Sequence, residues 1–142
     1  MPPAQATFPS SPNGVRHDVG FEICLPPRPA STADARHVIR RRLGELLDDE
    51  TLDDVLLVVS ELVTNAVLYG HGDVTLQMGF DGGCVSGTVG DEGSGFTLTA
   101  RELDSLQVGG HGLAIVGRIA SGWGLREGSS HVWFQVSARR RR

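Results

Sequence analysis

The sequence predicts an α/β (α+β) two-layer sandwich, in which helices cover one face of a mixed, mostly antiparallel sheet. Apolar residues alternate with a period of two in several short segments and follow a helical period in longer ones. Glycine-rich stretches between short segments are typical of hairpins. The resulting order, β-α-α-β-β-α-β-β, therefore favours one sheet with the helices stacked on one face.

Length and composition restrict the class of protein. The chain has 142 residues, of which 39% are hydrophobic, and this suits one domain with a core that needs no metal or disulfide. We expect a disordered leader over residues 1–18, a folded domain over 19–138 and an arginine tail over 139–142. No apolar run approaches the roughly 18 residues of a membrane helix, and no secretory signal is evident. A cytoplasmic protein without membrane contact is the default expectation.

Charge is distributed unevenly along the chain. All 13 basic residues are arginine, and removing Arg16, Asp18 and the run Arg139–Arg142 leaves 8 arginines against 16 acidic residues in the body, a net charge of −8. An acidic body argues against direct nucleic-acid binding, which depends on neutralising phosphates. The arginine run could contact RNA or an acidic partner, although a solvated end is the commoner case. Cys24 and Cys84 lack any zinc-binding spacing and are expected to be small core residues.

The first half of the chain predicts one strand and two helices. Residues 19–25 alternate and stop at a pair of prolines, as a strand does. Ser31 or Thr32 can cap a helix that runs to about residue 47. A second helix runs over about residues 52–69 and ends at a glycine. Its buried stripe is expected to consist of Leu52, Val55, Leu56, Val59, Leu62, Val63 and Ala66.

The second half predicts two hairpins separated by a helix. Strands are expected over residues 74–80 and 84–89, a helix over 113–120, and a final hairpin of strands 124–127 and 132–137. Residues 97–109 are polar and weakly patterned, with one short helical stretch expected around 100–106.

An acid and an amide share one face of the second predicted helix. Glu61 and Asn65 are four residues apart and point away from the buried stripe. A solvated polar face is the ordinary explanation, but asparagine is a poor helix former, so Asn65 in mid-helix requires a reason. An amide oxygen that binds Mg²⁺ would supply one, because Mg²⁺ takes oxygen ligands. Glu61 could then act as a general base.

A carboxylate beside two glycines follows the strand 84–89. Gly93 and Gly95 would let the backbone turn sharply and approach a flat ligand closely. The carboxylate of Asp91 could accept a hydrogen bond from an adenine amino group, since that group is a donor. A simple Asp-x-Gly turn is an equal alternative.

A second glycine pair opens the helix predicted over 113–120. Exposed N–H groups at a helix start bind phosphate well, so Gly110 and Gly112 could border a phosphate group, with a flexible loop as the alternative. The segment is not a Walker A loop, because the chain contains no lysine.

Together, the three motifs resemble the N, G1 and G2 boxes of the GHKL ATPases. They are Glu61–Ala66, Asp91–Phe96 and Gly110–Val116. The short chain and the segment Val132–Phe134 look most like the small bacterial anti-sigma-factor serine/threonine kinases. The resemblance covers about residues 19–138 and implies the Bergerat fold, with ATP held between the sheet-side motifs and a mobile lid.

The resemblance also implies the site residues. Glu61 would be the catalytic base, Asn65 the ligand of Mg²⁺, and Asp91 the residue that binds adenine, in one pocket with Gly93 and Gly95. Gly110, Gly112 and Leu113 would border the phosphates. Apart from the resemblance, His111 inside the glycine pair could reach a phosphate, although a lone loop histidine is more often solvated, and Arg101 in the lid is a further candidate.

Two positions depart from the resemblance. Family members often carry a threonine just before the final Val-Trp-Phe, which helps to hold adenine through water. Here His131 stands there, with Ser129 and Ser130 upstream. Members often have Arg-His after the N-box helix, where this chain has Leu68-Tyr69-Gly70-His71.

The function implied is an ATP-binding regulator with protein serine/threonine kinase activity. It would phosphorylate an anti-sigma-factor antagonist and sequester a sigma factor, and a homodimer is left open. The alternative is a binding module without a useful kinase rate, which acts by sequestration alone. A histidine-kinase catalytic domain fits less well, because no helix pair with a phospho-acceptor histidine precedes the motifs.

Overall fold

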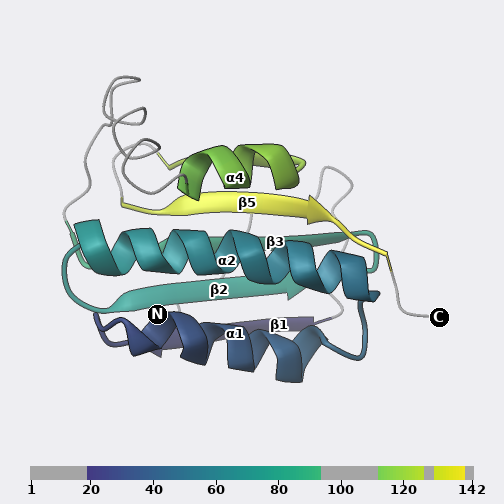
Figure 1. The fold of residues 1–142 in the computed structure, drawn as a ribbon, viewed down its shortest axis with the longest axis horizontal. Coiled ribbons are helices and arrows are strands. Elements are labelled where there is room, and N and C mark those ends of the chain that lie inside the picture. Colours follow the sequence, from purple (N-terminus) through teal and green to yellow (C-terminus); the bar gives the residue numbers. More distant parts are fainter. Residues whose placement is uncertain (1–18, 94–111, 127–129, 140–142) are drawn as a thin grey trace, which may run out of the picture.

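A computed structural model describes residues 19–93, 112–126 and 130–139 of the chain. Its elements are β1 (Val19–Leu25), α1 (Ala30–Leu43), α2 (Asp49–Tyr69), β2 (Val74–Phe80), β3 (Cys84–Gly90), α4 (Gly112–Ile119), β4 (Gly122–Leu125) and β5 (Val132–Ser137). The strands form one five-stranded sheet in the order β1-β2-β3-β5-β4, and the helices lie together on one face of it (Figure 1). The predicted two-layer sandwich is confirmed. Every strand pair in the described part of the sheet is antiparallel.

The core lies between the apolar stripe of α2 and the inner face of the sheet. The predicted stripe is buried from Leu52 to Val63, and only its last member, Ala66, is partly exposed. Alternate strand residues meet the stripe, including Met78, Phe80 and Phe134, each at most 1% exposed. Helical periodicity therefore identified the buried face of α2, and alternate strand side chains form the other side of the same layer.

The outer face of the sheet carries small and polar side chains instead. One row across it pairs Glu22 with Gln77, Gln77 with Thr88, and Thr88 with Trp133. The Thr88 hydroxyl donates to the Gln77 side-chain oxygen at 3.2 Å, which satisfies both buried polar groups.

Both cysteines lie on this outer face, so the prediction that they are core residues is wrong. Cys24 is exposed and Cys84 is partly exposed. Their strand neighbours Leu25 and Val85 are buried. Because side chains alternate along a strand, an inward neighbour forces each cysteine outward. Burial raises the pKa of both thiols, and Asp73 raises that of Cys24 further.

Helix α1 begins without the predicted side-chain cap. Its N-cap residue is Pro29, whose fixed backbone suits a first turn. The buried Ser31 hydroxyl donates backwards to the Pro26 carbonyl oxygen at 2.5 Å. The Thr32 hydroxyl pairs with that of Thr64 on α2 at 3.0 Å. The two hydroxyls predicted as possible caps therefore bond to the preceding loop and to α2 instead of capping α1.

The acidic stretch after α1 provides the start of α2. Helix α1 ends at Leu43, earlier than predicted, and α2 begins at Asp49, also earlier. Asp48 is the N-cap of α2, and its carboxylate accepts from the Thr51 backbone N–H at 2.9 Å. The negative charges of the first turn complement the helix dipole.

The last hairpin is shifted from its predicted position. Strand β4 covers residues 122–125 rather than 124–127. The register places Trp123 opposite Phe134, and Trp123 packs against the core. Gly124 lies under the Trp133 ring, where an added Cβ would stand 2.9 Å from the indole nitrogen. We attribute the register of β4 to the packing of Trp123 and Trp133. These contacts join different strands, so the periodicity of one short segment does not predict them.

We expect Gly87→Ala to destabilise the fold. A Cβ at residue 87 would lie 2.6 Å from Phe134 Cζ and 2.8 Å from the Gln77 carbonyl oxygen. Overpacking of this kind should lower the free energy of unfolding by about 1–3 kcal/mol, measured by urea denaturation.

Gly20→Ala in β1 is the matched control, because the nearest atom to its added Cβ is the Met78 carbonyl oxygen at 3.8 Å. It should lower the free energy of unfolding by no more than about 0.5 kcal/mol. Equal losses in the two variants would contradict the packing described.

Candidate functional site

The described parts of the three sequence motifs lie toward the same end of the molecule. Helix α2 ends beside the segment that follows β3, since an added Cβ at Gly70 would collide with the Asp91 carboxylate. Strand β4 returns antiparallel to β5, so the preceding helix α4 starts at this same end. Figure 1 shows α4 alongside α2, starting on the side of the molecule toward which α2 runs. The topology therefore places the start of α4 near Asp91 and the last turns of α2.

Helix α2 divides its polar side chains between two neighbours. Ser60 and Thr64 turn toward α1, where Arg36 Nη1 donates to Ser60 Oγ at 2.7 Å and Thr32 pairs with Thr64 at 3.0 Å. Glu61 and Asn65 follow these residues by one position, so they are rotated by about 100° away from α1. Figure 1 shows α4 on that other side of α2.

Glu61 and Asn65 are both partly exposed. Neither side chain forms a hydrogen bond within the described part of the chain. An amide oxygen is a group that can ligate a hard cation, and a carboxylate can accept a proton, so the residue types suit the roles predicted from the sequence. Both residues lie in α2, four positions apart, so they share one face of the helix as predicted from the sequence.

The Asp91 carboxylate lies in a notch at the end of α2. Asp91 Oδ1 accepts the Gly93 backbone N–H at 2.6 Å, which forms the predicted Asp-x-Gly turn. Asp91 Oδ2 stands over Gly70, and an added Cβ there would also lie 2.5 Å from the Ala66 carbonyl oxygen. Gly70 is thus more than the helix stop that the sequence indicated, because any side chain at this position would fill the notch.

A second acid joins the same two segments. The Glu92 backbone N–H donates to the His71 carbonyl oxygen at 2.8 Å, and the Glu92 carboxylate accepts the Asp73 N–H at 2.8 Å. Gly72, with a φ of 69°, lies directly under that carboxylate. Glycine suits a positive φ, and an added Cβ would strike Glu92. Sequence analysis assigned no role to Glu92 or Gly72, although together they fix the position of Asp91.

Ser130, rather than His131, lies beside Asp91. The Ser130 hydroxyl, 8% exposed, donates to the Asp91 carbonyl oxygen at 3.2 Å and accepts the Asp91 N–H at 3.4 Å. The His131 ring instead covers Gly90, where an added Cβ would collide with it. Because strand side chains alternate, Ser130 and His131 serve opposite faces of the sheet. The Ser130 hydroxyl therefore holds the main chain of Asp91 from the segment just before β5.

Several predicted site residues lie outside the described residues or only partly inside them. Gly95, Arg101, Gly110, His111 and the stretch 97–109 are outside. Gly112 begins α4 as the sequence predicted within one residue. Leu113 belongs to the same first turn, which places both at the start of the helix.

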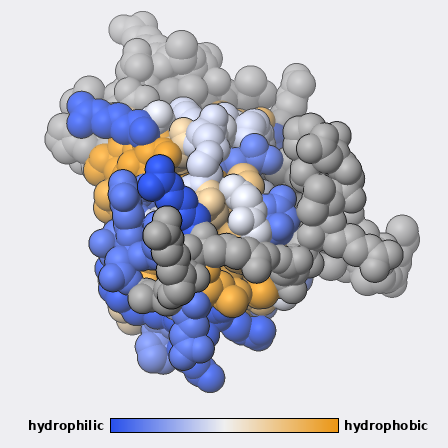
Figure 2. Space-filling model, turned by 90° about the vertical axis from the view of Figure 1, so that its right-hand side faces the viewer, coloured by the Kyte–Doolittle hydropathy of each residue, from blue (hydrophilic) through white to orange (hydrophobic). Residues whose placement is uncertain are grey.

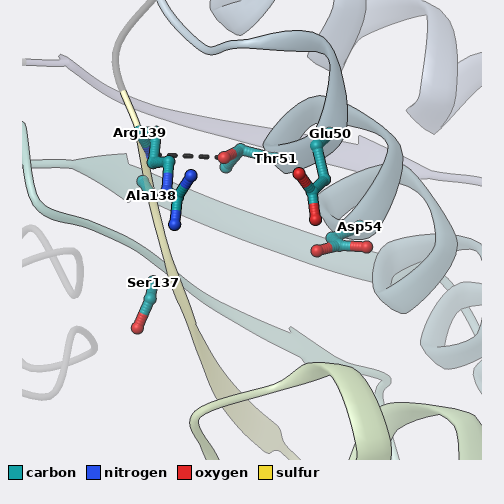
Figure 3. Close-up of a pocket in the computed structure, with 6 residues that line it drawn as sticks. All are labelled: Glu50, Thr51, Asp54, Ser137, Ala138 and Arg139. Carbon is teal, nitrogen blue, oxygen red and sulfur yellow. Dashed lines mark hydrogen bonds between the residues drawn. The ribbon is translucent and has the colours of Figure 1, made fainter.

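A separate recess lies at the opposite end of α2, where β5 finishes. It has a volume of about 260 Å³ and is lined by Glu50, Thr51, Asp54, Ser137, Ala138 and Arg139 (Figure 3). Viewed from this end, hydrophilic side chains cover much of the helix layer (Figure 2). Burial, and then Glu50 and Asp53, raise the pKa of the Asp54 carboxyl. A recess with two carboxylates repels phosphates, so it is a poor nucleotide site.

The first residue of the arginine tail is anchored at this recess. The Arg139 backbone N–H donates to the Thr51 hydroxyl at 3.1 Å, and its carbonyl oxygen accepts the Asp48 N–H at 2.9 Å. The expectation of a solvated end therefore does not hold for the main chain of Arg139, while its side chain is exposed. Residues 140–142 lie outside the described part.

Comparison with known proteins agrees with this geometry. A family model for the histidine kinase-like ATPase domain matches residues 25–135. The crystal structure of the RsbU and RsbW domains of Rv1364c from Mycobacterium tuberculosis matches with a TM-score of 0.63 and 21% identity. The match covers 86% of this chain and 32% of that one, and at this identity it concerns the fold alone. No curated protein sequence matches.

The fold is that of a two-layer α/β sandwich, with the described parts of the three motifs toward one end of it. The chain belongs to the histidine kinase-like ATPase family, since the family model covers most of it. The resemblance to GHKL ATPases is thereby confirmed, and membership implies ATP binding. None of the helices that the structure describes is long and apolar enough to cross a membrane.

We expect His131 to make the fold less stable in mild acid. Burial, and then Arg126, lower the pKa of His131 from 6.5, against an opposing effect of Asp91. The unfolded chain therefore binds this proton more readily than the folded one. Stability should fall as the pH drops below 6.5, until the pH lies below the lowered folded pKa.

Thermal melts of wild type and His131→Gln between about pH 7.5 and pH 5 would measure this effect. The variant should lose less stability across that range than wild type. Parallel pH profiles would show that His131 does not contribute.

Proposed function

We propose that this chain is an ATP-dependent protein serine/threonine kinase of the anti-sigma-factor type. The observation that carries the proposal is the meeting of Asp91 with the end of the helix that bears Glu61 and Asn65. Family membership supports the nucleotide, and the fold likeness to a structure that contains an RsbW domain supports the regulatory class.

In this proposal Asp91 reads the adenine base. Its carboxylate accepts hydrogen bonds only, which suits an exocyclic amino group. Gly70 leaves room for that carboxylate at the end of α2, and the Gly93 N–H holds one carboxylate oxygen in place. Ser130 fixes the Asp91 main chain from β5, and Gly95 would extend the turn.

Asn65 and Glu61 would serve the chemistry. The half-exposed Asn65 amide oxygen would hold Mg²⁺, which offsets negative charge on phosphate oxygens when it is bound. Glu61, one turn away, would accept the proton of the acceptor hydroxyl. The start of α4 would border the phosphates through Gly110, His111, Gly112 and Leu113, and Arg101 would add a cation from the lid over 97–109.

The proposed partners are a sigma factor and an anti-sigma-factor antagonist. Phosphorylation of the antagonist would switch which of the two the kinase binds, in the cytoplasm and without direct contact to nucleic acid. The domain that carries this activity would be residues 19–138, and its assembly as a homodimer stays open.

The alternative is a nucleotide-dependent module that only sequesters its partner. The altered adenine surroundings favour keeping this alternative, because His131 stands before the final Val-Trp-Phe where family members often carry a threonine. Glu61 favours the kinase, because pure sequestration requires no base at this position.

Asp91→Asn should weaken ATP binding without unfolding the protein. The amide places a donor where the adenine amino group needs an acceptor, and one such mismatch costs about 1–3 kcal/mol. Calorimetry with ATP and GTP would measure it, and wild type should prefer ATP.

Asp81→Asn is the matched control, because Asp81 holds a similar turn by accepting the Gly83 and Cys84 N–H groups in the β2–β3 connection. It should leave ATP affinity unchanged. Equal affinity of wild type for ATP and GTP would remove Asp91 as the adenine reader.

Glu61→Gln should abolish most phosphoryl transfer while leaving ATP binding nearly intact. A general base acts mainly in the transition state, and its loss costs about 10²–10⁴-fold in rate. The assay incubates labelled ATP and Mg²⁺ with purified antagonist candidates encoded near this chain, and Glu50→Gln on the same helix is the control.

The outcomes separate the two functions. Lost transfer with retained partner binding supports the kinase. If wild type transfers nothing but still binds its partner, the binding module is correct. Undiminished transfer by Glu61→Gln would take Glu61 out of the mechanism.

A further inference from the structure

Two of the exposed large hydrophobic side chains lie on one ridge of α2. Leu57 is 39% exposed and Leu68 is 63% exposed. Residues separated by four, seven and eleven positions stack along one line of an α-helix, so Leu57, Glu61, Thr64 and Leu68 form one outward ridge. The proposed base Glu61 thus stands between two exposed leucines.

Helix α1 borders this ridge on one side. Thr32 of α1 bonds to Thr64 of α2, and Arg36, four residues later in α1, bonds to Ser60, four residues earlier in α2. The two helices are therefore antiparallel with matched turns. The next step places the exposed Arg40 beside the turn of α2 that carries Leu57.

The segment that contains α1 is basic within an acidic body. Residues 28–42 hold five arginines and one aspartate, a net charge of +4, so the rest of the −8 body carries −12. An acidic protein surface is attracted to this segment and repelled by the remainder. The charge pattern therefore selects both the kind of partner and the side from which it approaches.

We propose that the protein partner docks along the α2 ridge. Apolar side chains of the partner would cover Leu57 and Leu68, and an acidic patch of the partner would face Arg36 and Arg40. This inference rests on the proposed function, because it brings the acceptor serine or threonine of the partner to Glu61.

A second copy of this chain fits the ridge less well. A two-fold contact centred on the ridge would bring the two Glu61 carboxylates together, and like charges in contact are unfavourable. An acidic partner that covers Leu57 and Leu68 would instead place its acceptor hydroxyl opposite Glu61.

The test measures transfer kinetics with the antagonist that wild type phosphorylates. Leu57→Asp and Leu68→Asp should each raise the KM for that protein at least about tenfold, with kcat and ATP affinity near those of wild type, because docking contributes equally to ground and transition states. Arg40→Glu should raise the KM and weaken its dependence on salt.

Two matched controls lie off the ridge. Leu46→Asp changes a leucine of nearly equal exposure, 38%, in the connection after α1. Arg41→Glu makes the same charge change as Arg40→Glu, one position further round α1. Both should keep the wild-type KM. Unchanged thermal melts and ATP affinity would show that the ridge variants fold, and Arg40→Glu, a surface change, tests the ridge independently.

Each outcome decides the proposal. An unchanged KM in all three ridge variants overturns docking and leaves the kinase assignment intact. A loss of dimer in the ridge variants with an unchanged KM means that a second copy covers the ridge, and this also overturns it. If wild type neither phosphorylates nor binds any candidate, the proposed function fails and docking fails with it. If wild type binds without transfer, the same variants should raise the Kd at least about tenfold.

Discussion

The contact of the Asp91 carboxylate with the end of α2 is the constraint on which the candidate site depends. It requires glycine at position 70, and the Glu92 bonds to the loop after α2 hold it in place. The helix is fixed at its other end as well, where Asp48 and Thr51 bind the Arg139 main chain. A helix held at both ends gives Glu61 and Asn65 a defined position relative to the sheet.

The long periodic elements could be predicted from sequence because burial repeats along them. The stripe of α2 contains several independent positions that agree, and β2 and β3 are buried along almost their whole length. The N-cap of α1 could not be predicted correctly from the sequence. The Ser31 hydroxyl donates to a carbonyl oxygen of the preceding loop, and the Thr32 hydroxyl pairs with a side chain of α2. The register of β4 depends on tryptophan packing across strands, which a local pattern does not contain.

The site shows the same division. Glu61, Asn65 and Asp91 could be predicted as candidate site residues because residue type and local spacing mark them in the sequence. It missed the partners of Asp91, since Ser130 is 39 residues away in the chain. In the sequence, Gly70 indicated only the end of a helix. In the structure, the Asp91 carboxylate lies so close to Gly70 that no side chain fits at this position. The roles of these residues in binding and catalysis remain proposals, whereas the family and the fold are established by comparison.

The most direct test of this account maps ATP binding by nuclear magnetic resonance on the isotopically labelled chain. With ATP and Mg²⁺, the account predicts that the largest shifts of backbone amide signals occur at residues 70–73, 91–93 and 112–113. The acidic recess at Glu50, Thr51 and Arg139 should stay unchanged. Largest shifts at that recess, or no shifts at the Asp91 end, would contradict the central claim that the three motifs form one nucleotide site.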